Sequence, residues 1–115
     1  MVIDPISRIE RMTEKRINFI DEFTDCPGGR LEIHGEFSGQ EFREKLLKPA
    51  LQQFDRVVLN LNGAVGFPSS FIDEVFGILS HEVGYDRMKQ QLVIDLTDDP
   101  LALREIEECM LAHRA

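Results

Sequence analysis

Two adjacent serines, Ser69 and Ser70, are the residues whose setting most clearly suggests chemistry. They lie in GAVGFPSSFIDEVFG, directly after the apolar run RVVLNL and before apolar residues at helical spacing. A hydroxyl at the start of a helix lies close to free main-chain N–H groups, which also bind phosphate. The serines are therefore consistent with a helix cap, which the residues alone favour, and with a switch in which phosphorylation adds about −1.5 to −2 charges.

The residues after the serines have the features of a helix start. Ser70 and Asp73 have the spacing of a capping box, and Asp73 and Glu74 lie where acidic side chains complement a helix dipole. Successive helical residues point about 100° apart, so these two carboxylates are not expected to act as an acid–base pair. A phosphate on Ser70 would be repelled by both, and this repulsion would disrupt a docked partner.

No other constellation typical of catalysis or metal binding is recognised. His34, His81 and His113 are far apart, and none is expected to have a metal-ligand partner nearby. Cys109 is interpreted as a small packing residue, and Cys26 lies in a turn with no base to activate it. The sequence therefore predicts a protein that is not an enzyme and has neither a metal nor a cofactor.

The composition indicates one soluble domain. Of the 115 residues, 43% are hydrophobic and 30% are charged, and the net charge is −8. Basic side chains form no stripe, so neither nucleic acid nor an anionic membrane is expected as a partner. No apolar run approaches the roughly 20 residues that span a bilayer. Two distant cysteines without a signal-peptide pattern predict free thiols and a cytoplasmic location.

The apolar pattern predicts an α/β domain with the element order β-β-α-β-α-β-α. An antiparallel strand pair begins the domain, and helices then alternate with two buried strands, which predicts a four-stranded mixed sheet with helices packed on it. The predicted strands are 16–23, 30–37, 56–61 and 91–96, and the predicted helices are 38–54, 70–83 and 100–115.

Local signals mark several boundaries. Ser38 opens a capping box, Asp99 is a suitable N-cap, and residues 84–90 are predicted to form a turn. Pro49 falls inside a helical pattern, so that helix is expected to be kinked or split near Lys48.

The chain is divided into an N-terminal arm or short helix, residues 1–15, and a domain, residues 16–115. The arm is expected to pack on the domain or on a second subunit, which leaves a homodimer open. Its apolar residues recur every three positions, at Ile3, Ile6, Ile9 and Met12.

Several short motifs lie between residues 30 and 79, nearly half of the chain. A glycine precedes an S-G-x-x-F-R helix start, L-x-P-A-L ends that helix, an apolar strand follows, and a long S-S-F segment comes last. In this pattern the chain resembles the STAS-like family of unknown function. The matching residues are Gly35, Ser38-Gly39, Phe42-Arg43, Leu47–Leu51, Val57–Leu61 and Gly66–Gly77.

The resemblance implies a fold similar to the STAS domains of anti-sigma-factor antagonists. In those proteins, a partner kinase related to the histidine-kinase ATPases phosphorylates a serine at the start of the helix after the central strand, and this governs binding. Counting from Asn60 places Ser70 at the regulated position, with Ser69 beside it. Pro68 and Phe71 stand where the antagonists have aspartate and glycine.

The sequence thus predicts a non-enzymatic bacterial regulatory module that binds a protein, such as an ATPase of the histidine-kinase type or a serine kinase. Ser70 and then Ser69 are the candidate phosphoacceptors, and an exposed Phe67 would support an interaction loop. The alternative is a small-molecule or nucleotide-binding domain that uses the Gly63–Ser70 loop at the sheet edge. The predicted partner-binding loop comprises Gly66, Phe67, Pro68, Ser69, Ser70, Asp73 and Glu74.

Overall fold

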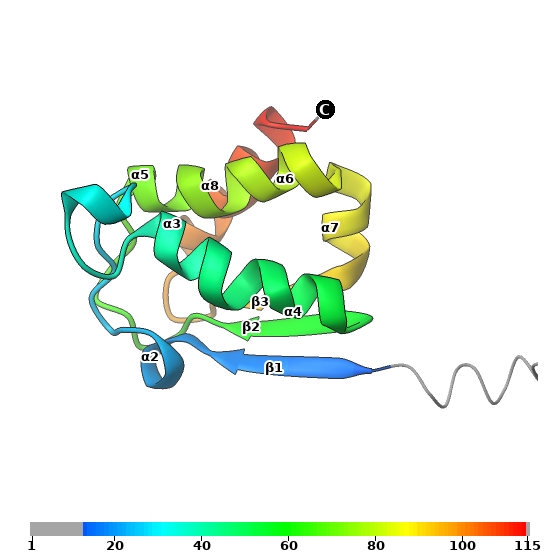
Figure 1. Ribbon diagram of the computed structural model, residues 1–115, viewed down its shortest axis with the longest axis horizontal. Helices are drawn as coiled ribbons and strands as arrows, with labels where there is room; N and C mark the ends of the chain where they lie inside the picture. The colour runs from blue at the N-terminus through cyan, green and yellow to red at the C-terminus, as the bar shows by residue number, and fades with distance from the viewer. Residues whose placement is uncertain (1–12, 115) are drawn as a thin grey trace, which may run out of the picture.

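A parallel sheet of three strands forms the base of the structure, a computed structural model that describes residues 13–114 (Figure 1). Ile17 lies opposite Leu59, and Leu59 lies opposite Ile94. Because the strands are parallel, helical connections carry the chain from each strand to the next. The strands, in spatial order, are β1 (Glu14–Asn18), β2 (Arg56–Asn60) and β3 (Leu92–Asp95).

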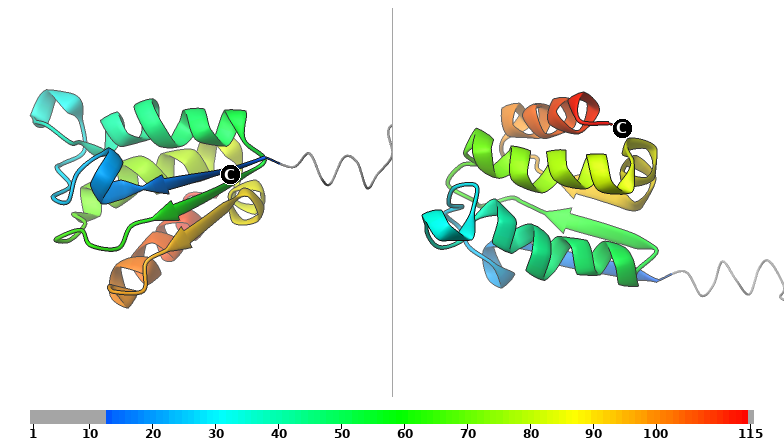
Figure 2. Two further views of the ribbon diagram at one scale, coloured as in Figure 1. Left: turned by 90° about the horizontal axis from the view of Figure 1, so that it is seen from below. Right: turned by 45° about the horizontal axis from the view of Figure 1, so that its top comes forward.

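Two long helical segments make these connections. Figures 1 and 2 show them side by side over one face of the sheet, with α8 packed against the second segment. The first segment consists of α3 (Gly39–Phe42), η2 (Arg43–Leu47) and α4 (Lys48–Gln53). The second consists of α5 (Ser69–Ile72), η3 (Asp73–Gly77) and α6 (Ile78–Val83). A shorter helix, α7 (Tyr85–Gln91), leads into β3, and α8 (Pro100–Ala112) follows β3.

Each long segment contains a π turn near its middle, η2 in the first and η3 in the second. In the first segment the π turn ends at Leu47, and a new α-helical stretch begins at Lys48 with Pro49 in its first turn. Proline has no main-chain N–H, and its ring crowds the carbonyl four residues earlier, so a wider turn accommodates it. The helix predicted to be kinked or split near Lys48 changes there from π to α geometry, while Leu47 and Lys48 both keep helical backbone angles.

The core lies between the sheet and the two long segments. Phe19, Phe42 and Phe71 are almost completely buried, and their ring centroids are 4.9 to 6.2 Å apart. Aromatic rings at these separations attract each other in addition to the effect of burial. Aliphatic side chains from the strands and from α8, including Leu59 and Ile106, complete the core.

The prediction of a four-stranded mixed sheet was wrong, because the sheet formed by residues 13–114 has three strands that are all parallel. Residues 30–37 form a loop with one 3₁₀ turn, η1 (Glu32–His34), and Ile33 in that turn is 85% exposed. A main-chain hydrogen bond of 2.8 Å from Gly28 to Phe37 helps to close the loop on itself. The loop therefore pairs its backbone groups locally, and the apolar residues that suggested a strand face no core.

Two further element predictions were wrong, the first of them only after residue 18. The first strand starts at Glu14, and after Asn18 the chain turns into a short helix, α2 (Phe19–Glu22), which places Phe19 in the core. The predicted turn at 84–90 is helix α7, whose residue Met88 is buried. Here the tertiary contacts, rather than local turn signals, decide the conformation.

The two predicted helix caps outside the serine segment are confirmed. Ser38 Oγ accepts a hydrogen bond from the main-chain N–H of Glu41 at 3.1 Å. Asp99 Oδ1 accepts one from the main-chain N–H of Ala102, also at 3.1 Å. Each cap pairs one of the free donors at a helix start.

The predicted N-terminal arm falls largely outside the described residues, and its last two residues, Glu14 and Lys15, belong to β1. Within residues 13–114, no helix is long and apolar enough to cross a membrane.

Candidate functional site

The carboxyl ends of the strands carry a row of polar side chains. Asn18, Asn60 and Asp95 lie opposite one another in the sheet. Asn62 connects the last two, because its Nδ2 donates to Asn60 Oδ1 and to Asp95 Oδ1, at 3.0 Å each. Its Oδ1 accepts a hydrogen bond from the main-chain N–H of Thr97 at 2.8 Å. The loops after β2 and β3 are thereby fastened to each other.

The candidate phosphoacceptor serines lie at the start of α5. The helix begins at Ser69 with Pro68 at the N-cap and no side-chain cap, so the predicted capping role of Ser70 was wrong. Ser69 is exposed, and its Oγ donates to Glu105 Oε1 of α8 at 2.6 Å. Ser70 is half-buried, and the Phe71 side chain points into the core with only 1% of the residue exposed. Ser69 is the more accessible hydroxyl.

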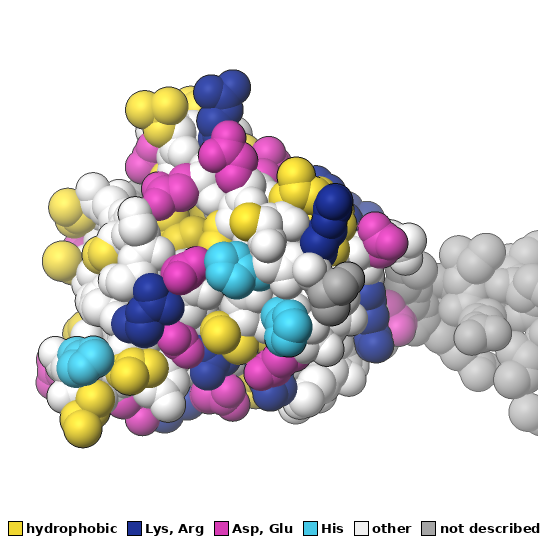
Figure 3. Space-filling model, turned by 90° about the horizontal axis from the view of Figure 1, so that it is seen from above, with side chains coloured by type: hydrophobic (Ala, Val, Ile, Leu, Met, Phe, Trp, Pro, Cys, Tyr) yellow, Lys and Arg dark blue, Asp and Glu magenta, His cyan; other side chains and the backbone are white. Residues whose placement is uncertain are grey.

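Exposed hydrophobic side chains occur at this end of the molecule. Val65, in the loop after β2, is 81% exposed, and Leu101, in the first turn of α8, is 77% exposed. Phe67 is half-buried, with its ring centroid 5.5 Å from that of Phe19 and 6.2 Å from that of Phe71. Figure 3 looks onto the second long segment and α8 and shows hydrophobic side chains projecting between charged ones. The exposed apolar surface is thus provided by Val65 and Leu101 rather than by Phe67.

A buried ion pair joins the two π turns. The side chains of Arg43 in η2 and Glu74 in η3 are each 9% exposed and form a salt bridge. Arg43 Nη1 also donates to the main-chain carbonyl of Glu74 at 2.6 Å. Burial lowers the pKa of Arg43, but its interactions with Glu74 and Glu44 outweigh this effect, and the pKa is raised above its usual value. Glu74, predicted as part of the partner-binding loop, lies inside the domain as the partner of Arg43.

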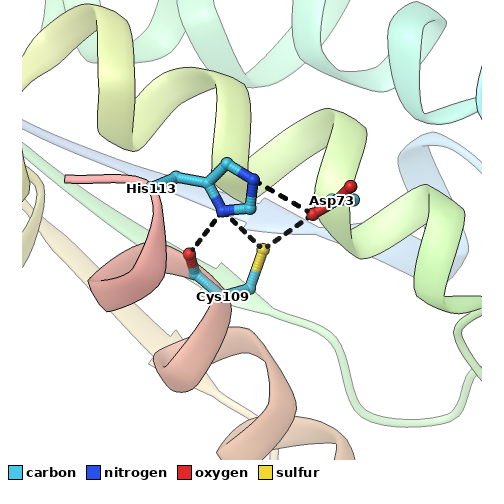
Figure 4. Close-up of side chains that lie close together, drawn as sticks. All are labelled: Asp73, Cys109 and His113. Atoms are coloured by element: carbon cyan, nitrogen blue, oxygen red, sulfur yellow. Dashed lines mark hydrogen bonds and ion pairs between the residues drawn. The ribbon is translucent and has the colours of Figure 1, made fainter. Parts of the chain in front are cut away.

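A second cluster joins η3 to the end of α8 and was not predicted (Figure 4). Asp73 Oδ1 lies 3.4 Å from Cys109 Sγ and 3.4 Å from His113 Nε2. His113 Nδ1 lies 2.9 Å from the Cys109 carbonyl oxygen and 3.8 Å from Cys109 Sγ. The expectation that His113 has no possible ligand partner nearby was wrong. The available signal was the four-residue spacing of Cys109 and His113, which brings both to one face of a helix.

The charges around Asp73 keep its side chain ionised. Burial alone raises the pKa of Asp73. The hydrogen bonds from Arg30 and Cys109 and the charge of His113 lower it by more than burial raises it, so the pKa lies below its usual value. Arg30 Nη2 holds the second carboxylate oxygen, Oδ2, at 3.2 Å. Asp73 therefore presents Oδ1 to Cys109 and His113 as an acceptor.

The cluster is unsuited to nucleophilic catalysis. Burial, the hydrogen bond to Asp73 and the charges of Asp73 and Glu105 raise the pKa of Cys109 to about 12, whereas a nucleophilic cysteine requires a lowered pKa. A carbonyl oxygen can only accept a hydrogen bond, so the His113 Nδ1 that faces the Cys109 carbonyl carries a proton. That nitrogen cannot remove the proton from the thiol.

The chain matches a family described as a STAS-like domain of unknown function over residues 38–101, more than half of its length. The chain belongs to this family. No curated protein and no solved structure matches it. The STAS-like match includes Arg43, Ser69 and Asp73, whereas Cys109 and His113 follow it. The cluster therefore combines one residue of the matched region with two beyond it.

In this STAS-like domain, Cys109 is expected to react with thiol reagents much more slowly than the exposed Cys26. A thiol reacts as its thiolate, and a pKa of about 12 leaves very little thiolate at pH 8. An aromatic disulfide reagent should show a fast phase and a second phase at least about 100-fold slower. Cys26→Ser should retain only the slow phase, with a rate that rises with pH. A single fast phase in that variant would contradict the described setting of Cys109.

Proposed function

We propose that this STAS-like domain is a regulatory protein-interaction module without catalytic activity of its own. It binds its partner through the carboxyl end of the sheet. Membership of the STAS-like family supports this function at a general level. The proposed contact surface, termed the edge face, consists of Val65, Phe67, Pro68, Ser69 and Leu101. Val65 and Leu101 supply its exposed apolar groups, Ser69 its modifiable hydroxyl, and Phe67 is half-buried within it.

The observation that carries the proposal is the hydrogen bond from Ser69 to Glu105. It joins the first residue of α5 to the first half of α8, and both flank the edge face. Phosphorylation of Ser69 removes the hydroxyl proton that Glu105 accepts and places a second negative group against that carboxylate. A phosphate is thus expected to separate the two helices locally and to change the edge face. The modifying partner is a serine kinase or an ATPase of the histidine-kinase type.

The chain purified from its natural host is expected to carry phosphate on Ser69, with Ser70 as the second candidate. Ser69 is favoured because its hydroxyl is exposed and Ser70 is half-buried. Mass spectrometry of the peptide that contains both serines measures this directly. If that peptide is found only in its unmodified form under every growth condition tested, the switch is refuted while the interaction face remains open to its own test.

The interaction face is tested by affinity capture with the immobilised chain. Val65→Glu combined with Leu101→Glu should reduce the captured partner at least about tenfold, since charges replace exposed apolar contacts. Leu111→Glu is the matched control, because Leu111 is also exposed but lies at the other end of α8. Ser69→Asp should weaken capture and Ser69→Ala should not. Equal capture by the wild type and the double variant would rule out the edge face.

The alternative function, small-molecule binding at the Gly63–Ser70 loop, receives less support. The main-chain N–H of Gly63 already donates to Asp98 Oδ2 at 2.8 Å, so it does not point at a free site. A cavity of about 410 Å³ lies at the opposite end of the sheet, beside Phe54 and Arg87. In a thermal-shift screen, nucleotides are not expected to raise the unfolding midpoint of the domain by binding at the Gly63–Ser70 loop.

A further inference from the structure

The geometry points to a zinc-binding site formed by Asp73 of η3 and by Cys109 and His113 at the end of α8. The three side chains offer an oxygen, a sulfur and a nitrogen, which all lie within 4.8 Å of one another. Figure 4 shows the three side chains directed toward a common point between the helices. Carboxylate, thiolate and imidazole are the three side-chain ligands that zinc uses in proteins.

Two of the three distances between the ligand atoms match those within a zinc site. Asp73 Oδ1 is 3.4 Å from both Cys109 Sγ and His113 Nε2. In a tetrahedral site with bonds of about 2.0–2.3 Å, neighbouring ligand atoms lie about 3.3–3.7 Å apart. The third pair, Cys109 Sγ and His113 Nε2, lies within 4.8 Å, and side-chain rotations that shorten this distance bring all three atoms to one ion.

The hydrogen bonds around the cluster orient the ligands toward the ion. His113 Nδ1 donates to the Cys109 carbonyl at 2.9 Å, so in the neutral ring the lone pair is on Nε2. That nitrogen lies 3.4 Å from an oxygen of the Asp73 carboxylate, a contact that either a proton on Nε2 or a bound cation makes favourable. Arg30 binds the other oxygen of Asp73 at 3.2 Å. A backbone carbonyl on the imidazole and a donor on the carboxylate are typical outer contacts of metal ligands.

The packing brings the ligands close together and leaves them accessible to solvent. A side chain at Gly77 would place its Cβ 3.2 Å from the His113 ring and 3.3 Å from Cys109 Sγ, so glycine allows the two helices to meet there. The side chains of Asp73 and His113 are 38% and 43% exposed, so solvent reaches the cluster. Three protein ligands leave the fourth tetrahedral position for water.

The donor set selects the metal. Magnesium and calcium prefer oxygen ligands, whereas a mixed sulfur, nitrogen and oxygen set suits zinc. When zinc binds, the Cys109 S–H bond breaks, its proton and the proton between His113 Nε2 and Asp73 leave to solvent, and the electron pairs of the thiolate and of Nε2 form the bonds to the metal. No oxidation or reduction takes place. The bound ion joins η3 to α8 and so braces the two helices that flank the edge face.

Zinc titration of the untagged full chain tests the site. We expect one zinc ion per chain with a dissociation constant below about 10 µM, measured by competition with a chromophoric chelator. Cobalt in place of zinc should produce a cobalt–thiolate charge-transfer band. Cys109→Ala and His113→Ala should each weaken zinc binding at least about tenfold. Cys26→Ala and His34→Ala are the matched controls and should bind zinc like the wild type.

Thermal unfolding separates loss of the site from loss of the fold. Without zinc, each variant should show a cooperative transition, and zinc should raise the midpoint of the wild type but not that of Cys109→Ala. Zinc binding that is absent in the folded wild type overturns the proposal. So does binding that survives in the combined Cys109→Ala and His113→Ala variant, because the ion is then bound elsewhere.

Discussion

Glu74→Ala is expected to destabilise the domain by about 3–5 kcal/mol, because it removes the buried partner of Arg43 and leaves the guanidinium only the exposed Glu44. Both side chains are 9% exposed, and the guanidinium contacts both the carboxylate and the main-chain carbonyl of Glu74. Urea unfolding followed by circular dichroism measures the loss. The urea concentration at the midpoint should fall, whereas the dependence of the unfolding free energy on urea concentration should stay similar. This is because the surface area exposed on unfolding hardly changes.

A matched surface pair provides the control for this prediction. Lys48 Nζ and Glu82 Oε2 lie 3.1 Å apart, but their side chains are 32% and 42% exposed. Glu82→Ala should therefore cost less than about 1 kcal/mol. Arg43→Met combined with Glu74→Leu should recover much of the stability lost in Glu74→Ala, because no unpaired charge remains inside. A loss below 1 kcal/mol for Glu74→Ala would show that the pair is solvated in solution.

Phe71→Ala is expected to cost about 3–5 kcal/mol, the usual range for removal of a buried aromatic ring. Phe71 is 1% exposed, and its centroid lies 5.9 Å from that of Phe19 and 6.2 Å from that of Phe42. The Phe71 ring therefore anchors the start of α5, the helix that begins at Ser69, in the core. The same unfolding experiment measures the loss.

Two variants control for this substitution. Phe67→Ala removes a ring that is only half-buried and should cost clearly less than Phe71→Ala. Phe71→Leu retains most of the buried volume and should fall between the wild type and Phe71→Ala. Equal losses for Phe67→Ala and Phe71→Ala would refute the central position of Phe71. The anti-sigma-factor antagonists named above have glycine where this chain has Phe71. A glycine at position 71 is expected to leave the core of this domain without a ring that it needs.

Much of the fold followed from local pattern. The apolar run that became β2 and the capped helix starts at Ser38 and Asp99 were predicted because each depends on neighbouring residues. The strand prediction for the segment with Leu31 and Ile33 failed, because its alternation resembles a strand although Ile33 is exposed and no strand within residues 13–114 pairs with it. Pairing of a strand depends on distant residues, which a local pattern does not contain.

The site was predictable only in part. The position of Ser69 and Ser70 at a helix start followed from sequence, but the bond to Glu105, 36 residues away, did not. Cys109 and His113 could have been paired from their spacing on one helix. Asp73 reaches them only because η3 packs on α8, and that contact has no local signal.

The two π turns have a consequence for how related chains align. A π turn has one residue more than an α turn, so deleting one residue within η2 or η3 would restore a continuous α-helix. The extra residue is accommodated inside the widened turn, so its removal would re-aim the side chains of the turn itself, Arg43 in η2 and Glu74 in η3. We therefore expect that a relative with a one-residue gap opposite either turn also lacks the pair formed here by Arg43 and Glu74. Such a gap in an alignment would mark a branch of the family in which the two helices are joined by other side chains.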